Sequence, residues 1–218
     1  KMVLDPHGYI SEVRHSQAKI LLMRHPQTVA NQARRFLGAQ NMPLSELGQQ
    51  QLKQAIEGLV SWQPTEIVSS PLERCLAIAE PVAQRLGLDI KIDERVAEID
   101  FGAAEGLTHQ EAMDKGLSLP WGETAAYWPV EGAESIEQFA ERLRAAAEDL
   151  ELRQGKTAVI AHGGVIRGLS SYWLHIPVSR LWNMTVRNVE STLFVNDRDD
   201  GITLERFGIK PEWLAGII

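Results

Sequence analysis

Two histidines stand directly after apolar runs of the sequence, where they could act together. The run 20–23 ends at Arg24 and His25, and the run 157–161 ends at His162. Such runs are typical of strands buried in a parallel sheet, and ligands of these sheets bind beyond the carboxyl ends of the strands. If both strands belong to one sheet, we expect the two imidazoles at the same edge. There they could serve as a nucleophile or as anion-binding groups, the alternative being structural histidines satisfied by the backbone.

A third segment adds an arginine to this edge. Residues 66–69 predict another short strand, and the helix that follows it carries Arg74 in its first turn. Together with Arg24, His25 and His162 this makes four basic groups, which would repel one another unless an anion lay between them. An opposite pair of unit charges about 4 Å apart is worth roughly 4 kcal/mol at an effective dielectric constant of about 20. We therefore expect a dianionic phosphate group at this edge.

The same charges set the protonation state of His25. Flanking arginines disfavour a protonated imidazole, so His25 is expected to be partly neutral and nucleophilic near pH 7. An alcohol that leaves a phosphate group also needs a proton, which a nearby carboxylic acid would supply. Glu98 is the best placed candidate for this acid, followed by Asp100 and Glu105.

The rest of the sequence alternates predicted strands and helices. This alternation predicts an α/β fold in which one sheet is covered by helices on both faces. Between residues 99 and 132, glycines and prolines indicate an irregular excursion, and the charges of the helix after it are expected to face solvent. The predicted helices are 45–60, 71–86, 134–152 and 165–174, and the further predicted strands are 90–92 and a hairpin of 190–196 and 202–207.

The composition is that of an ordinary globular domain. The chain has 218 residues, of which 44% are hydrophobic and 23% charged, so one domain is favoured over two. Residues 1–18 have no apolar periodicity and are expected to form a flexible tail before a single domain at 19–218. The apolar run 213–218 could pack on this domain or on a second copy of the chain, so a homodimer stays open.

Charge and cysteine content argue against several classes of partner and compartment. A formal net charge of −7 argues against a nucleic-acid surface or an anionic membrane surface as the main partner. Cys75 is the single cysteine, so no internal disulfide can form, and we expect a small core residue there. No run approaches the roughly 20 apolar residues of a membrane helix, and no signal-peptide pattern begins the sequence, so a cytoplasmic protein is expected.

Five blocks of the sequence, in this order and within residues 19–196, resemble those of the histidine phosphatase superfamily, also called phosphoglycerate mutase-like. Each block alone would be weak evidence, but their order makes the resemblance specific. The first block continues through Asn31 and the segment 43–51. The blocks begin with RHPQT at 24–28, SSPLER at 69–74, EIDFG at 98–102, GAES at 132–135 and AHGGVIR at 161–167.

The resemblance implies a fold and a reaction. The implied fold is a three-layer α/β/α sandwich with a mainly parallel central sheet. In the implied reaction His25 forms a phosphohistidine intermediate, Glu98 donates a proton to the leaving oxygen, and water then hydrolyses the intermediate. Arg24, Arg74 and His162 are implied to hold the phosphoryl group.

The resemblance also bears on ligands. Asn31 is implied to contribute to the phosphate pocket, although this residue type would also suit a cap of the helix that follows. No metal ion and no other cofactor is implied. The implied partner is a small phosphorylated metabolite, whose recognition is expected within residues 103–135. Trp121, Tyr127 and Trp128 of that segment could line a substrate wall or pack the segment.

Two departures from the family pattern concern activity. The family usually has glycine where this chain has Pro26, so one backbone N–H donor near the phosphate is lost. Gln27 and Thr28 replace the Glu-Ser that is usual in the cofactor-dependent mutases, and the chain is short, so a phosphatase is favoured. A phosphoglycerate mutase and a catalytically silent phosphate-binding module stay as alternatives.

Overall fold

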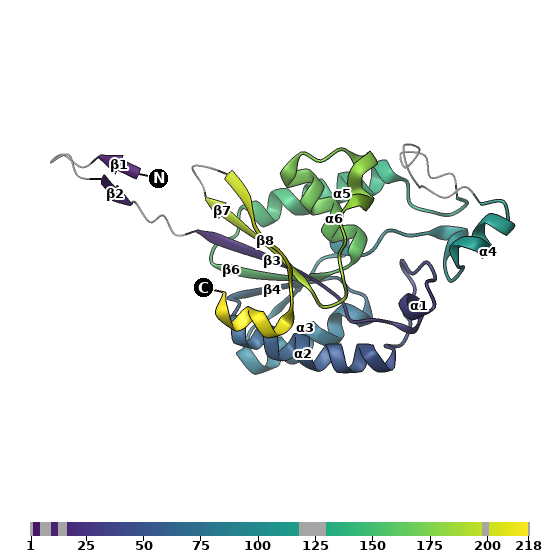
Figure 1. The fold of residues 1–218 in the computed structure, drawn as a ribbon, viewed down its shortest axis with the longest axis horizontal. Coiled ribbons are helices and arrows are strands. Elements are labelled where there is room, and N and C mark those ends of the chain that lie inside the picture. Colours follow the sequence, from purple (N-terminus) through teal and green to yellow (C-terminus); the bar gives the residue numbers. More distant parts are fainter. Residues whose placement is uncertain (1, 5–9, 13–16, 118–129, 198–200, 218) are drawn as a thin grey trace.

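A six-stranded mixed sheet forms the centre of the molecule (Figure 1). The computed structural model describes residues 2–4, 10–12, 17–117, 130–197 and 201–217. The strands follow the order β5-β4-β6-β3-β7-β8; the first four are parallel to one another, and β7 and β8 run antiparallel to their neighbours. The predicted, mainly parallel sheet is confirmed. The strands are β3 (Ala18–Arg24), β4 (Glu66–Ser69), β5 (Ile90–Ile92), β6 (Lys156–Ala161), β7 (Ser191–Asp197) and β8 (Gly201–Ile209).

Helices cover both faces of this sheet. In Figure 1, α2 (Glu46–Trp62) and α3 (Glu73–Leu86) lie below it, and α5 (Ile136–Glu151) and α6 (Gly163–Leu174) lie above it. The predicted three-layer α/β/α sandwich is therefore confirmed. Each of these helices begins and ends within two residues of its predicted bounds.

Strand β3 shows why the core has two halves. Successive side chains of a strand point to opposite faces of the sheet. Ile20 and Leu22 join the cluster that includes α5 and α6, whereas Leu21 and Met23 join the cluster that includes α2 and α3. None of the four is more than 1% exposed. A strand buried on both faces has to be apolar throughout, which explains the unbroken run in the sequence.

The register of the two central strands decides where the histidines lie. Strands β3 and β6 are parallel neighbours, with Arg24 opposite Ala161. His25 and His162 are the next residues of the two segments, so both leave the sheet at the same level. The expectation that they emerge at one edge is met because no strand lies between β3 and β6.

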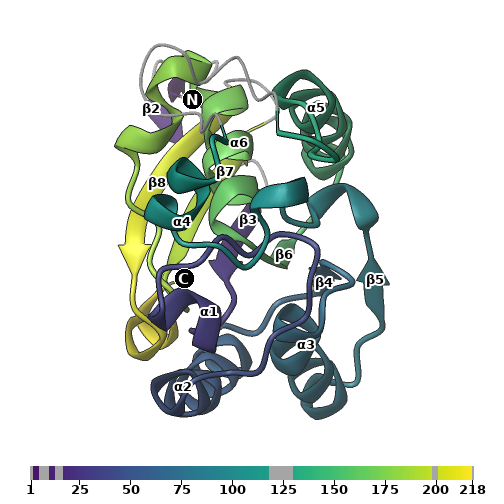
Figure 2. The same ribbon diagram turned by 90° about the vertical axis from the view of Figure 1, so that its right-hand side faces the viewer.

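Figure 2 looks at this edge of the sheet. Two short helices, α1 (Val29–Gln32) and α4 (His109–Asp114), lie in front of the strand ends. Helix α4 falls within the segment that was predicted to be irregular, so the prediction was wrong there. Thr108 and Glu111 form a capping box at the start of α4, a Thr-x-x-Glu signal that the sequence contained.

The N-terminal strands form a separate two-stranded sheet, whereas the C-terminal segment packs on the core of the domain. Strands β1 (Met2–Leu4) and β2 (Ile10–Glu12) pair as an antiparallel sheet of their own, inside the segment predicted as a tail. At the other end, a 3₁₀ helix (Pro211–Gly216) packs against α2, and Leu214 and Ile217 are buried in the core. The apolar C-terminal run thus packs on its own domain. Among the described residues, no helix has the length and apolar character needed to cross a membrane.

Candidate active site

His25 is held by hydrogen bonds to the backbone on two sides. Its backbone N–H donates to the carbonyl of Ala161 at 3.0 Å, and its ring Nδ1 lies 2.7 Å from the carbonyl oxygen of Pro26. A carbonyl can only accept, so Nδ1 carries the proton and the lone pair of the neutral ring is on Nε2. Within the described part of the chain, Nε2 has no hydrogen-bond partner. Pro26 lacks an N–H, but it still supplies the carbonyl that fixes this tautomer.

The surroundings of His25 favour its neutral form. Burial lowers the pKa of His25 well below its usual value of 6.5, and the charges of Arg24 and Arg74 lower it further, while the hydrogen bond to Pro26 acts the other way. The sequence predicted that flanking arginines would disfavour the protonated form of His25. Burial, at 3% exposure of the side chain, is the larger cause.

His162 lies beside His25 and is paired with Arg74. The two imidazole ring centroids are 5.2 Å apart. Arg74 donates from Nε to Nδ1 of His162 at 3.3 Å, and because a guanidinium can only donate, the proton of the neutral ring is on Nε2, 2.7 Å from Oγ of Ser70. Burial, followed by the charge of Arg74, lowers the pKa of His162 well below 6.5. Arg74 and His162 therefore form one buried hydrogen-bonded pair next to His25.

The two arginines differ in what they contact. Arg74 donates its terminal nitrogens to the carbonyls of Gly38, at 2.6 Å, and Gln40, at 2.8 Å. Arg24 donates one terminal nitrogen to the carbonyl of Val186 at 2.6 Å, but its buried Nε has no partner among the described residues. Burial lowers the pKa of Arg24 to about 10. An anion beside His25 would give this buried donor an acceptor.

Glu98 is the carboxylate that reaches the same place. Its two oxygens accept from the backbone N–H groups of Ile99 and Gly164, each at 3.1 Å. A side chain at Gly164 would place its Cβ 2.3 Å from Glu98, so only glycine allows this approach. The other two acid candidates are engaged elsewhere: Glu105 accepts from three backbone N–H groups, and Asp100 accepts from Gly102.

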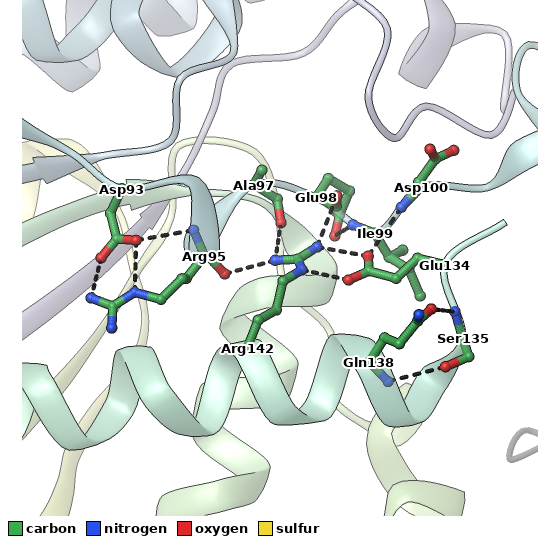
Figure 3. Close-up of polar contacts among 10 residues, drawn as sticks. All are labelled: Asp93, Arg95, Ala97, Glu98, Ile99, Asp100, Glu134, Ser135, Gln138 and Arg142. Carbon is green, nitrogen blue, oxygen red and sulfur yellow. Dashed lines mark hydrogen bonds and ion pairs between the residues drawn. The ribbon is translucent and has the colours of Figure 1, made fainter.

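Arg142 of α5 holds the segment that carries Glu98 in place by hydrogen bonds (Figure 3). Arg142 donates to three carbonyls of this segment, those of Arg95 (2.6 Å), Ala97 (2.8 Å) and Glu98 (3.1 Å). Its Nε and its terminal nitrogen Nη2 donate to the two carboxylate oxygens of Glu134, at 2.5 and 2.8 Å. The charges of α5 were expected to face solvent, and for Arg142 that expectation was wrong. The helical pattern contains no signal that separates Arg142 from the exposed Arg144.

Asn31 lies at the third position of α1 and takes the capping role. Its Oδ1 accepts from the backbone N–H of Thr28 at 3.1 Å, which completes a capping box for α1. The residue also lines the pocket described below, and its part in binding phosphate stays a prediction. Asn188, which sequence analysis missed, donates to the carbonyl of His25 at 2.9 Å and lies 3.5 Å from Oδ1 of Asn31. The loop after β3 is therefore tied to the loop before β7.

A pocket of about 160 Å³ opens next to the two histidines. Arg24 and Gly163, the chain neighbours of His25 and His162, line it together with Glu98. Sequence analysis did not single out its lining residue Arg167, although the last family block ends there. Trp121, Tyr127 and Trp128 lie outside the described residues. The remaining lining residues are Asn31, Arg35, Phe36, Leu37, Ile99, Phe101, Gly164 and Trp182.

Among the residues that the structure describes, no three histidine, cysteine, aspartate or glutamate side chains gather closely enough to hold a metal ion. The chemistry that the residues themselves offer is a neutral imidazole nucleophile, a carboxyl group, and guanidinium donors for an anion.

Three comparisons place this geometry among known proteins. Residues 20–210 match the family model of the Histidine phosphatase superfamily (branch 1). Glucosyl-3-phosphoglycerate phosphatase of Mycobacterium tuberculosis (strain CDC 1551 / Oshkosh) is 35% identical over 173 residues, which cover 74% of this chain and 77% of that protein. A Salmonella paratyphi C protein named "Probable phosphoglycerate mutase GpmB" is 33% identical over 177 residues, covering 78% and 81%.

A solved structure gives the same fold. Mycobacterial glucosyl-3-phosphoglycerate phosphatase in complex with VO3 matches with a TM-score of 0.74 at 30% identity, covering 88% of this chain and 99% of that one. The fold and the family expected from the five sequence blocks are confirmed.

Proposed function

Because the chain belongs to the histidine phosphatase superfamily (branch 1), we propose that it hydrolyses a phosphomonoester of a small metabolite through a phosphohistidine at His25. The observation that carries this proposal is the neutral imidazole of His25, whose Nε2 has no hydrogen-bond partner among the described residues while Nδ1 donates to the carbonyl of Pro26. The unpartnered Nε of Arg24 adds a donor for the phosphoryl group at the same place.

In the first half of the proposed reaction, Nε2 of His25 attacks phosphorus. A nitrogen–phosphorus bond forms, the bond from phosphorus to the leaving oxygen breaks, and Glu98 gives its proton to that oxygen. Arg24 and Arg74 hold the phosphoryl group, so the buried guanidinium charges stabilise negative charge on its oxygens, and His162 positions Arg74 through the hydrogen bond between them. The Nδ1–H of His25 keeps its hydrogen bond to Pro26, which supports the positive charge that the ring acquires.

In the second half, water takes the place of the departed alcohol. Glu98, now a carboxylate, removes a proton from this water as its oxygen attacks phosphorus. The nitrogen–phosphorus bond breaks, inorganic phosphate forms, and His25 returns to its neutral state. The position of Glu98 at the pocket, beside the first turn of α6, supports both of its roles.

The substrate is proposed to resemble those of the phosphatase relatives. The mycobacterial relatives are named for glucosyl-3-phosphoglycerate, a phosphate ester of a small organic acid derivative. The pocket beside Arg24 and Glu98, of about 160 Å³, suits the portion of a small metabolite next to the phosphate.

Phosphoglycerate mutase activity is the second candidate, because a relative named for it is 33% identical. The two activities are separated by following 3-phosphoglycerate with and without 2,3-bisphosphoglycerate as primer. Formation of 2-phosphoglycerate that depends on the primer would favour the mutase. Release of inorganic phosphate from the monoester without a primer would favour the phosphatase.

The direct test is release of inorganic phosphate at pH 5 to 8 from a panel of phosphorylated metabolites, with EDTA present. We expect turnover of small phosphomonoesters by the wild type and phosphate attached to His25 when the reaction is stopped at alkaline pH and the peptides are analysed by mass spectrometry. Phosphate binding without turnover would replace this proposal by the silent binding module. Loss of activity in EDTA would contradict its metal-free chemistry.

A further inference from the structure

Ser70 lies directly after strand β4, beside the segment that carries His162. Strands β4 and β6 are parallel neighbours with Ser69 opposite Ile160, so Ser70 and His162 leave the sheet close to each other. The backbone N–H of Ser70 donates to the carbonyl of Ile160 at 3.0 Å, and the residue is 0% exposed. The sheet register therefore places the Ser70 hydroxyl group next to the His162 ring.

The hydroxyl oxygen of Ser70 accepts the proton of His162. Nε2 of the ring lies 2.7 Å from this oxygen and 3.5 Å from the sulfur of Cys75, which is a much weaker acceptor. On the other side of the ring, Nδ1 accepts from Nε of Arg74 at 3.3 Å. Both ring nitrogens are thus engaged, and the orientation of the ring is fixed from two sides.

The Ser70 hydroxyl group is also tied to the helix that carries Arg74. Its oxygen accepts from the backbone N–H of Leu72 at 3.3 Å, and Leu72 is the residue directly before α3. The contacts therefore form a closed circuit that runs from Ser70 through the start of α3 to Arg74, and through His162 back to Ser70. A change in the Ser70 hydroxyl group would be felt at both of the other side chains.

Arg74 depends on this circuit for the orientation of its guanidinium. Its terminal nitrogens donate to the carbonyls of Gly38 and Gln40, and its Nε donates to His162. These three contacts fix a planar group, whereas two would let it turn. Each terminal nitrogen carries a second N–H, which can bind an anion beside His25 only if the plane is held.

Other buried serines do not contact side chains of the site. Ser69 donates its hydroxyl group to the carbonyl of Ser70 at 2.9 Å. Ser170, in α6, is 2% exposed, and its hydroxyl group has no partner among the described residues. Burial of a serine near the sheet is therefore not sufficient to explain the contacts that Ser70 makes.

We propose that Ser70 is a positioning residue of the reaction. It holds the His162 ring so that Nδ1 faces Arg74, and His162 in turn orients the guanidinium of Arg74 toward the phosphoryl group. Ser70 acts through these two side chains and needs no contact with the substrate. This inference rests on the proposed phosphatase function, to which it adds a residue on the phosphoryl side of the site.

Ser70→Ala removes the acceptor with little change in volume. Nε2–H of His162 is then left with the weak acceptor Cys75, and kcat/KM should fall by roughly 10- to 100-fold. The loss should be equal for alkyl phosphates and for p-nitrophenyl phosphate, because Arg74 contacts the phosphoryl group that they share. The inhibition constant of vanadate should rise by a similar factor. A substitution of Glu98 should instead give a loss that depends on the leaving group.

Two further variants separate positioning from packing. Ser170→Ala also deletes a buried hydroxyl group and should leave kcat/KM unchanged. Ser70→Thr keeps the hydroxyl group and should retain more activity than Ser70→Ala. If Ser70→Ala does not fold, Ser70→Cys in reducing buffer takes its place, because a thiol has a similar size but accepts weakly.

Nitrogen-15 spectra of labelled histidine give a readout that does not depend on turnover. In the wild type, His162 should show a protonated Nε2 and an unprotonated Nδ1, with the signals assigned by His162→Asn. In Ser70→Ala the two nitrogen signals should move toward each other, because the ring is no longer held in one orientation and one tautomer. Ser70→Thr should restore the wild-type signals.

Unchanged kcat/KM in Ser70→Ala would overturn the inference, whatever the nitrogen signals show. A loss that differs between the two kinds of leaving group would also overturn it, because the effect would then lie at Glu98. If the wild type hydrolysed no phosphate ester, the proposed phosphatase function would fail, and calorimetric binding of inorganic phosphate would decide. Weaker binding by Ser70→Ala but not by Ser170→Ala would keep the positioning role, and equal binding would remove it.

Discussion

The floor of the site and its outer wall are built in different ways. The floor consists of His25, Arg74 and His162, whose side chains are 3%, 2% and 0% exposed and which follow directly from strand ends or begin a helix. The wall includes Glu98 and Arg167, which are partly exposed and depend on contacts from distant segments. Sheet topology fixes the floor, whereas individual side-chain contacts fix the wall.

The two regions also differ in charge. The floor gathers two histidines and Arg74, and in the proposed reaction it contacts the phosphoryl group whatever alcohol that group is attached to. The wall carries Glu98, the proposed acid, and the guanidinium of Arg167, and both line the pocket that the alcohol would occupy in the proposed reaction. This division suggests that reaction type and substrate choice can change separately, because a substitution in the wall leaves the strand register intact.

The largest expected effect is at the floor. His25→Ala removes the nucleophile, so kcat should fall by at least roughly 10⁴-fold on every substrate. His175→Asn is the matched control: His175 is an exposed histidine in left-handed conformation at the end of α6, which asparagine tolerates. Steady-state phosphate release measures both variants. Residual turnover above about one hundredth of the wild-type rate in His25→Ala would contradict the role of His25 as the nucleophile.

A substitution of the acid should depend on the leaving group. Glu98→Gln should lower the rate of phosphate release from alkyl phosphates by roughly 10²- to 10⁴-fold, because their alcohols need a proton. For p-nitrophenyl phosphate, whose leaving group needs no proton, the loss should be far smaller. Comparing kcat/KM of the two classes gives the result, and equal losses would remove Glu98 from the acid role.

The hydrogen bonds from Arg142 to the Glu98 segment should affect the rate by positioning Glu98. Arg142→Lys keeps one charge but loses the fork that reaches three carbonyls, so Glu98 is less well positioned and alkyl phosphates should react roughly 10- to 100-fold more slowly. The loss for p-nitrophenyl phosphate should be smaller, as with Glu98→Gln. Arg144→Lys on the exposed face of α5 is the control. A loss that is the same for both leaving groups would show a general structural role instead.

The buried floor predicts a pH-dependent stability. Burial lowers the pKa of His25 and His162 in the folded state, whereas the unfolded chain should titrate near 6.5. Below pH 6.5 the unfolded state therefore binds more protons, and the free energy of unfolding should fall with falling pH by up to about 1.4 kcal/mol per pH unit for each histidine. Urea unfolding at pH 7.5, 6.5 and 5.5 measures the slope. The double variant His25→Asn with His162→Asn should show a smaller slope of unfolding free energy against pH. An unchanged slope would show that other groups cause the pH dependence.

The smallest effect concerns the thiol behind the floor. Burial raises the pKa of Cys75 to about 12, and its side chain is 0% exposed. A thiol reagent at pH 8 should therefore leave native protein unlabelled and label one thiol per chain after unfolding in urea. Rapid labelling of the native protein would show that the floor opens to solvent.

The sequence predicted the floor better than the wall. Apolar runs that end in histidine placed His25 and His162 beyond strand ends, and five ordered blocks gave the family and the phosphatase activity for which the relatives are named. The capping box that starts α4 was present in the sequence but was outweighed by the glycines around it. The pairing of Arg142 with Glu134 was not predictable, because Glu134 precedes α5 and a helical pattern does not show which acid outside the helix an arginine will meet.

The sequence by itself determined the chemistry of the site, because residue types at strand ends follow the chain and need no distant partner to be located. The tertiary structure alone decided which ring nitrogen of His25 carries the proton, which of three carboxylates lines the pocket, and which carbonyls Arg24 and Arg74 contact. Each of these depends on atoms that are far apart along the chain or on the orientation of a ring. Hydrogen-bond geometry fixes such details, and a pattern of residue types does not contain it.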